Sequence, residues 1–167
     1  MLASVLTTYS GKSSDVQRNL QFGIANGRWG LKRQPVDWNK DSRFDWQVIG
    51  ACATGLKRGP RCQPEEWVTA LLDVYVFKVT SPLVLESGAY WPDEVTESAV
   101  KYPFRFDIEL MASARAVPTA YGEVLPRDIS EGIRRAATPG AESIAIIGDS
   151  VWSEFVDRIA HRGRRHS

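Results

Sequence analysis

The fold class is set by one stretch of the sequence, Trp67–Val79 (WVTALLDVYVFKV). Its second half alternates between two faces, one with Leu72, Val74 and Val76 and the other with Asp73, Tyr75 and Phe77. A period of two among β-branched and aromatic residues predicts a β-strand. The first half predicts either a continuation of this strand or a turn or short helix.

Weaker periodic signals surround this strand. They predict further strands at Leu2–Tyr9, Trp46–Ala53 and Phe104–Ala114, and helices through Val16–Ile24, Ile129–Ala136 and Trp152–Ala160. Arg28–Leu31 is expected to be a tight turn, and Ser81–Val100 mostly loop. Strands between terminal helices predict an α+β fold, with a barrel-like sheet of about five to six strands flanked by helices.

Length and composition fit one domain. The chain has 167 residues, of which 43% are hydrophobic and 25% charged, as is usual for a soluble globular protein. No repeat or low-complexity linker divides it. We expect residues 1–160 to form a single domain and residues 161–167, with three arginines and no acid, to be a disordered basic tail.

Positive and negative charges nearly cancel, giving a net charge of +1. This balance argues against a histone-like polyanion binder. The distribution is uneven, however: residues 28–61 contain eight basic and three acidic residues, whereas residues 62–110 contain three basic and nine acidic ones. We therefore expect a polarised molecule.

Several functional classes lack the residues that they need. The two cysteines, Cys52 and Cys62, are too few for a disulfide scaffold. The two histidines lie near the end of the sequence, far from both cysteines, so we expect no zinc site. There is no signal-peptide pattern and no apolar run of about 18 residues. The expectation is a cytoplasmic protein with no membrane association, no metal and no cofactor.

One short motif suggests an enzyme. Gly148-Asp149-Ser150 follows an apolar run and resembles the strand-to-serine turn of one class of esterases, which makes a small serine hydrolase using Ser150 an alternative. Its general base would have to be His161 or His166, both in the expected tail. Capping of the last helix by Asp149 or Ser150 explains the motif better.

A second motif, Asp107-Ile108-Glu109, offers the paired carboxylates of a metal-dependent nuclease. No lysine follows to activate water, and alternate residues of a strand with one solvated face account for both acids. We therefore expect no catalytic residue.

Aromatic residues in predicted loops lie beside basic residues and glycines. Trp29 lies between Arg28 and Gly30, and Tyr90-Trp91 precedes Pro92-Asp93-Glu94. Each ring alone is as readily a core residue, but a pair can stack a flat base at about 1–3 kcal/mol per base. The cations form two clusters, Arg28, Lys32 and Arg33, and Lys57, Arg58 and Arg61. A cationic rim around an aromatic slot indicates a nucleic-acid reader that extrudes a base.

Two passages resemble the EVE branch of the PUA superfamily, which is related to the YTH and ASCH domains. Thr7–Ser10 and the following helix lead into Asn26–Leu31, which resembles a "gvWGv" turn. Tyr90–Glu94 followed by Tyr102–Phe106 resembles a "wPde…yPyRv" passage. The matches span residues 1 to about 110. The resemblance implies a PUA-like pseudo-β-barrel that holds one modified base of a nucleic acid in an aromatic pocket.

The resemblance also implies roles for particular residues. Trp29 and Trp91 become the pocket walls, and Asp93 becomes an acceptor for an exocyclic amine, while Arg105 has at most a structural role. The residues implied for the base pocket are Tyr9, Ser10, Trp29, Gly30, Trp91 and Asp93. Those expected at the nucleic-acid backbone are Arg28, Lys32, Arg33, Lys57, Arg58 and Arg61.

The expected function is non-enzymatic reading of methylated double-stranded DNA, with 5-methylcytosine favoured over N6-methyladenine. A reader of modified RNA is the alternative within the binding class. A separate nuclease or effector protein would have to supply any cleavage.

Overall fold

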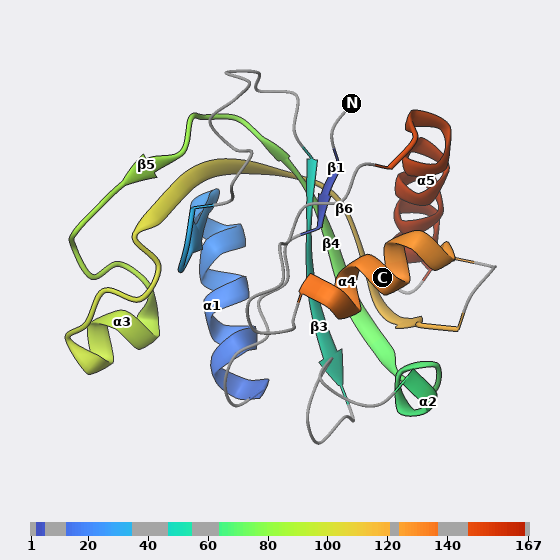
Figure 1. Cartoon of the computed structure of the whole chain (residues 1–167), viewed down its shortest axis with the longest axis horizontal. Coiled ribbons are helices and arrows are strands. Elements are labelled where there is room, and N and C mark those ends of the chain that lie inside the picture. The colour runs from blue at the N-terminus through green and yellow to red at the C-terminus, as the bar shows by residue number, and fades with distance from the viewer. Residues whose placement is uncertain are drawn as a thin grey trace.

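The central feature is a single curled sheet (Figure 1). The computed structural model describes residues 3–5, 13–34, 47–54, 64–120, 124–136 and 147–165. The strands within them are β1 (Ala3–Val5), β2 (Arg28–Leu31), β3 (Gln47–Thr54), β4 (Leu71–Val79), β5 (Val84–Leu85) and β6 (Phe104–Pro118). The helices are α1 (Ser13–Asn26), α2 (Pro64–Trp67), α3 (Pro92–Glu97), α4 (Arg127–Ala136) and α5 (Asp149–Arg165).

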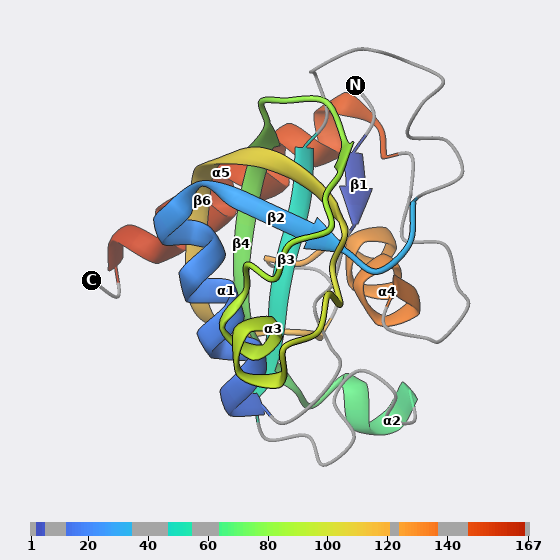
Figure 2. The same ribbon diagram turned by 90° about the vertical axis from the view of Figure 1, so that its left-hand side faces the viewer.

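The strand order is β1-β3-β4-β6-β2, and β5 also pairs with β6. Pairing is antiparallel except between β1 and β3, which are parallel. The sheet curls into a half-barrel, with helices on either side of it (Figures 1 and 2). The predicted α+β fold with a barrel-like sheet of five to six strands flanked by helices is thereby confirmed.

Strand β4 is central because both of its faces are buried. Leu72, Val74 and Val76 belong to a core packed against α4 and α5. Tyr75 and Phe77 belong to a second core, which contains Leu20 of α1 and Trp29 of β2. The predicted two-faced alternation is correct. The stretch begins at the last residue of α2, Trp67, and Val68 and Thr69 form a turn before β4 begins at Leu71. Helices α1 and α5 therefore lie on opposite faces of the sheet (Figure 2).

One expectation for an irregular segment was wrong. Arg28–Leu31 is not a turn but the strand β2, which pairs with residues 104–107 of β6 and places Trp29 opposite Phe106. Cross-strand aromatic pairs of this kind stabilise short strands. Ser81–Val100 is mostly irregular, as expected, and contains the short strand β5 and the short helix α3.

We expected residues 161–167 to be a disordered basic tail. Residues 161–165 instead continue the helix α5. Arg162 donates a hydrogen bond from Nη2 to the carbonyl oxygen of Ala116 at 2.8 Å, and Gly163 lies directly against the carbonyl oxygen of Ser113. Both contacts dock the last turn of α5 on β6. Cations in this turn also interact favourably with the helix dipole.

The contact at Gly163 predicts an unusual effect of Gly163→Ala. Alanine in place of glycine ordinarily stabilises a helix by about 0.5–1 kcal/mol. Here the added Cβ would overlap the Ser113 carbonyl oxygen, so we expect a loss of about 1–3 kcal/mol in the free energy of unfolding, measured by urea denaturation. Gly88→Ala, where a Cβ has no neighbour within 4 Å, is the control. A Gly163→Ala variant as stable as wild type would contradict the docking.

Candidate functional site

The motif at the start of α3 is organised around the carboxylate of Glu94, which is fully buried. It accepts hydrogen bonds at 2.7–3.1 Å from the backbone N–H groups of Tyr90, Trp91, Lys101 and Tyr102. Burial disfavours its ionised form, but these donors outweigh burial and hold the pKa of Glu94 below its usual value. The carboxylate therefore ties the beginning of α3 to the chain that leads into β6.

Arg105, on β6, completes this arrangement as a buried cation. Its Nη2 lies 3.0 Å from Glu94 Oε2 and also donates to the carbonyl oxygen of Gly88 at 2.6 Å. Its Nη1 donates to Glu86 at 2.9 Å, and its Nε to the Tyr102 carbonyl oxygen at 2.9 Å. We call Glu94 and Arg105, with these partners, the Glu94–Arg105 clamp. These contacts give Arg105 a structural role in the fold.

Arg28 belongs to the same network. Its Nη2 lies 2.6 Å from Glu86 and its Nε 3.5 Å from Asp107, while its guanidinium lies over the ring of Tyr90. Two carboxylates thus neutralise the charge of Arg28 within the protein. It is less suited to a phosphate contact than its position in the sequence suggested.

The clamp holds Trp91 between α1 and β2, where two glycines make room for it. A Cβ at Gly30 would lie 2.7 Å from Trp91 Nε1, and one at Gly23 would lie 3.0 Å from Trp91 Cζ3. Gly30, expected in the base pocket, therefore admits the indole of Trp91 rather than a ligand in this arrangement.

Trp91 joins an aromatic cluster that we define as Phe22, Trp29, Phe77, Tyr90, Trp91 and Tyr102. Trp29 and Trp91 are each 3% exposed, and their rings meet edge to face, with centroids 6.5 Å apart and planes at 70°. Two rings that stack on both faces of a base must be parallel to each other, with a gap between them as wide as the base is thick. The expected pair comes together, but not as the walls of an open slot.

The indole nitrogens distinguish this cluster from the other core. Of the four tryptophans in the described part of the chain, Trp67 donates from Nε1 to Ser130 Oγ at 3.0 Å and Trp152 donates to Gln47. Trp29 Nε1 and Trp91 Nε1 are buried and have no acceptor among the described residues. Buried donors usually have a partner, and one left unpaired costs about 1–3 kcal/mol. Two such donors in one cluster mark it as a candidate binding site.

Asn19, on α1, adds an acceptor that sequence analysis missed. Its side chain lies close enough to Asp93 and Tyr102 to exert a lowering effect on the pKa of each, while its Oδ1 is buried without a partner in the described part of the chain. The available signal was a polar residue three positions after Val16, within an otherwise apolar helical stripe.

Asp93 is already well supplied with donors. Its Oδ2 accepts from Tyr102 Oη at 3.0 Å and Lys101 Nζ at 3.3 Å, and Asn19 donates to it as well. Burial raises its pKa, but these hydrogen bonds prevail and the pKa lies below its usual value. Asn19 Oδ1 is therefore better suited than Asp93 to accept a hydrogen bond from an exocyclic amine.

The remaining predicted contacts fall into two groups. Lys32 and Arg33 are exposed immediately after β2, and Lys32 Nζ lies 6.0 Å from the ring of Tyr102. Both cations therefore directly follow the strand that carries Trp29. The residues outside the described ranges are Tyr9, Ser10, Lys57, Arg58 and Arg61.

The two motifs weighed for enzymatic roles lie on α5 and β6. Ser150 and His161 lie on the same helix, α5, eleven positions apart, which places them about 16 Å apart along its axis. Asp107 pairs with Arg28, and Glu109 is solvent-exposed. Among the described residues, no group of three or more His, Cys, Asp or Glu side chains could hold a metal ion. In the same residues, no helix is long and apolar enough to span a membrane.

No protein-family model matches this chain, and no curated protein sequence matches it either.

The clamp predicts a large and pH-dependent effect of Glu94→Gln. The amide nitrogen would face N–H donors, so we expect a loss of about 3 kcal/mol or more in the free energy of unfolding at pH 7. Because the folded-state pKa of Glu94 lies below the usual 4.5, its carboxylate contributes fully above about pH 5 and progressively less as pH falls. The stability difference between wild type and variant should narrow between about pH 5 and about pH 3, measured by urea denaturation.

Glu97→Gln is the matched control, because Glu97 is on the same helix, is mostly exposed and pairs only with Lys101 in the described structure. Exposed pairs contribute about 1 kcal/mol or less. Equal losses of stability in the two variants would contradict the role of the clamp. So would a stability difference between wild type and Glu94→Gln that does not change with pH.

Proposed function

We propose that this chain is an EVE-like reader of the PUA superfamily and binds nucleic acid that carries a methylated base, with methylated DNA as the main target. The base is held at the aromatic cluster, and the chain itself performs no chemistry. The observation that carries the proposal is the pair of buried indole N–H groups, Trp29 Nε1 and Trp91 Nε1, that lack acceptors among the described residues.

The types of unpaired atom favour 5-methylcytosine. The Watson–Crick edge of cytosine has two acceptors, N3 and O2, and one donor, the N4 amino group. The cluster offers two donors, the indole N–H groups, and Asn19 on α1 offers one acceptor, its Oδ1. N6-methyladenine presents one acceptor and one donor on the same edge, so it would leave one indole unpaired.

Binding in this way requires a local opening. The unpaired atoms are covered by other side chains, and the two indoles touch, so the flipped base must displace part of the cluster. A conformational step of this kind slows association. Burial of the methyl group itself contributes about 0.8 kcal/mol, or about fourfold in affinity.

The charge distribution supports a weak background affinity for unmodified DNA. Lys32 and Arg33 are exposed near the cluster, whereas Arg28 is neutralised by Glu86 and Asp107. Within the described ranges, few exposed cations near the site mean few counterions released on binding, and therefore a low affinity for unmodified DNA at physiological salt. A methylation reader gains selectivity from this.

The direct test compares binding to matched duplexes that carry cytosine, 5-methylcytosine or N6-methyladenine, at one salt concentration, by fluorescence anisotropy. We expect the 5-methylcytosine duplex to bind several-fold more tightly than the unmodified one. Equal affinity for all three would refute the proposal. A preference for methylated single-stranded RNA in competition would redirect it to RNA.

The site itself is tested by Trp29→Phe and Trp91→Phe, with Trp67→Phe as the matched control. Each variant shortens a buried ring, but only Trp67→Phe loses an existing hydrogen bond, the one to Ser130. We expect Trp67→Phe to lose about 1 kcal/mol more stability than the other two and to keep the preference for methylated DNA. The other two should lose most of that preference. If both retain it, the base is not read at this cluster.

A further inference from the structure

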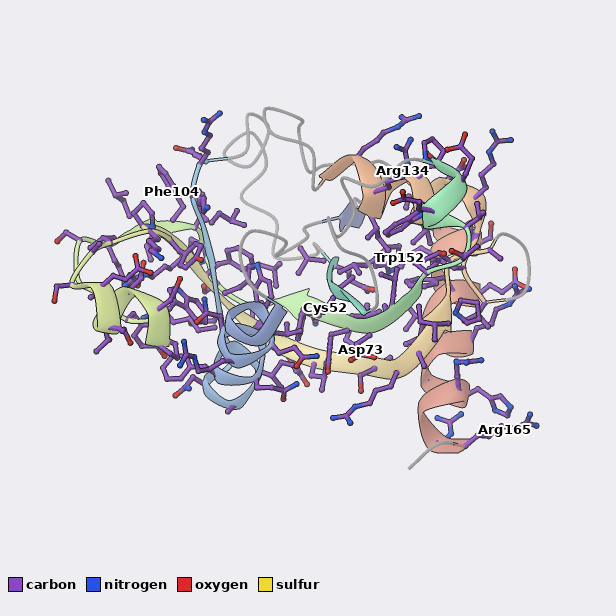
Figure 3. The ribbon with its side chains drawn as sticks, turned by 90° about the horizontal axis from the view of Figure 1, so that it is seen from below. Cys52, Asp73, Phe104, Arg134, Trp152 and Arg165 are labelled. Atoms are coloured by element: carbon purple, nitrogen blue, oxygen red, sulfur yellow. The ribbon has the colours of Figure 1, made fainter. Side chains whose placement is uncertain are left out.

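Helix α5 carries a row of basic side chains that the proposed base site does not use. We define the α5 basic stripe as Arg158, His161, Arg162 and Arg165. Their spacing of i, i+3, i+4 and i+7 puts them on one flank of the helix. Figure 3 shows Arg165 at the free end of α5, and no acidic residue follows Asp157 in the sequence.

The stripe lies beside the buried face of α5. Trp152, Phe155 and Ile159 pack into the core that α5 shares with β4. The contacts of Arg162 with the Ala116 carbonyl oxygen and of Gly163 with Ser113 hold the last turn against β6. Because the backbone beneath the stripe is fixed, binding a ligand there costs less conformational entropy than binding on a free tail.

Two of the cations near this turn are unneutralised. Arg165 and Arg115 are exposed, and neither forms an ion pair within the part of the chain that the structure describes. Arg115 lies on β6 between the two residues that α5 contacts. Arg158 is paired with Glu154 on its own helix, an exchangeable exposed pair.

We propose that the α5 basic stripe is a second contact for nucleic acid and binds the phosphate backbone of duplex DNA. The inference rests on the proposed function for the identity of the partner. Arg158 and Arg165 are about 10 Å apart along the helix axis, so two arginines on one flank of α5 can contact phosphates of the same duplex. Backbone contacts of this kind carry no base or methylation preference.

The geometry favours a duplex over an anionic membrane. A helix that lies on a membrane inserts an apolar face between the lipids. The apolar face of α5 is instead buried in the core. The large apolar residue of α5 that remains exposed is Val151, which lies two turns before Arg158.

The stripe and the aromatic cluster are on opposite faces of the sheet, as α5 and α1 are (Figure 2). The two sites therefore make separable contributions. The cluster provides the preference for a methylated base, and the stripe provides salt-dependent affinity for any duplex.

The test is the double variant Arg158→Gln/Arg165→Gln, studied with unmodified and 5-methylcytosine duplexes over a range of salt concentrations. Each phosphate contact contributes about 0.9 to the slope of log affinity against log salt. We expect the slope to fall by about 1.8 for both duplexes, with weaker binding at low salt and an unchanged ratio between the two affinities.

The matched control is Arg134→Gln/Arg135→Gln, in the last turn of α4. It also removes one ion-paired arginine, bound to Glu131, and one exposed arginine. Figure 3 shows Arg134 well apart from Arg165. We expect its salt slope to match that of wild type. Equal losses in both double variants would show a general charge effect and overturn the proposal.

Two further outcomes separate this proposal from the others. If the α5 variant loses binding to phosphatidylserine vesicles but not to DNA, the stripe is a membrane contact and the proposal fails. In the second outcome, wild type binds duplexes without a methylation preference while the α5 variant still lowers the salt slope. The stripe is then a DNA contact, and the proposed function fails.

Discussion

The ion pair between Glu94 and Arg105 is the interaction on which the α1 side of the molecule depends. It joins the start of α3 to the start of β6, and through Glu86 it also reaches Arg28 on β2. Burying two charges is costly unless hydrogen bonds replace the lost water. Here backbone N–H groups surround the carboxylate and backbone carbonyls accept from the guanidinium. The cost is thus offset by groups that the fold must satisfy in any case.

The clamp also determines where the unusual polar groups lie. It presses Trp91 between two glycines and against Trp29, and both indole N–H groups are left without acceptors in the described residues. On the other face of the sheet, Trp67 and Trp152 have acceptors. The same residue type is therefore fully paired where it only fills the core, and unpaired where we place the ligand. A binding site retains such unsatisfied groups at the expense of stability.

Net charge conceals how the cations are used. Arg28 and Arg105, which belong to the resembling passages, are neutralised inside the protein. The exposed cations of the described residues include Lys32 and Arg33 after β2 and Arg164 and Arg165 at the end of α5. A chain of near-zero net charge can thus present local positive surfaces, because some of its acidic residues, such as Glu86 and Glu94, form ion pairs inside the protein. The residues that give weak general affinity for a polyanion are therefore different from those that would recognise one base.

Local pattern was sufficient for the elements with a clear period. The two-faced alternation around Val74, the helical stripe through Leu20 and the closing helix after Trp152 were all predicted, because each is dictated by neighbours in the chain. The strand Arg28–Leu31 was not, since four residues become a strand only through pairing with Phe104–Asp107, far along the sequence. The last turn of α5 likewise depends on contacts with Ser113 and Ala116. The sequence by itself determined the fold class and singled out Trp29, Tyr90 and Trp91 from the aromatic cluster. Only the tertiary structure decided that their rings meet edge to face and which polar atoms stay unpaired, because both follow from long-range packing rather than from local periodicity.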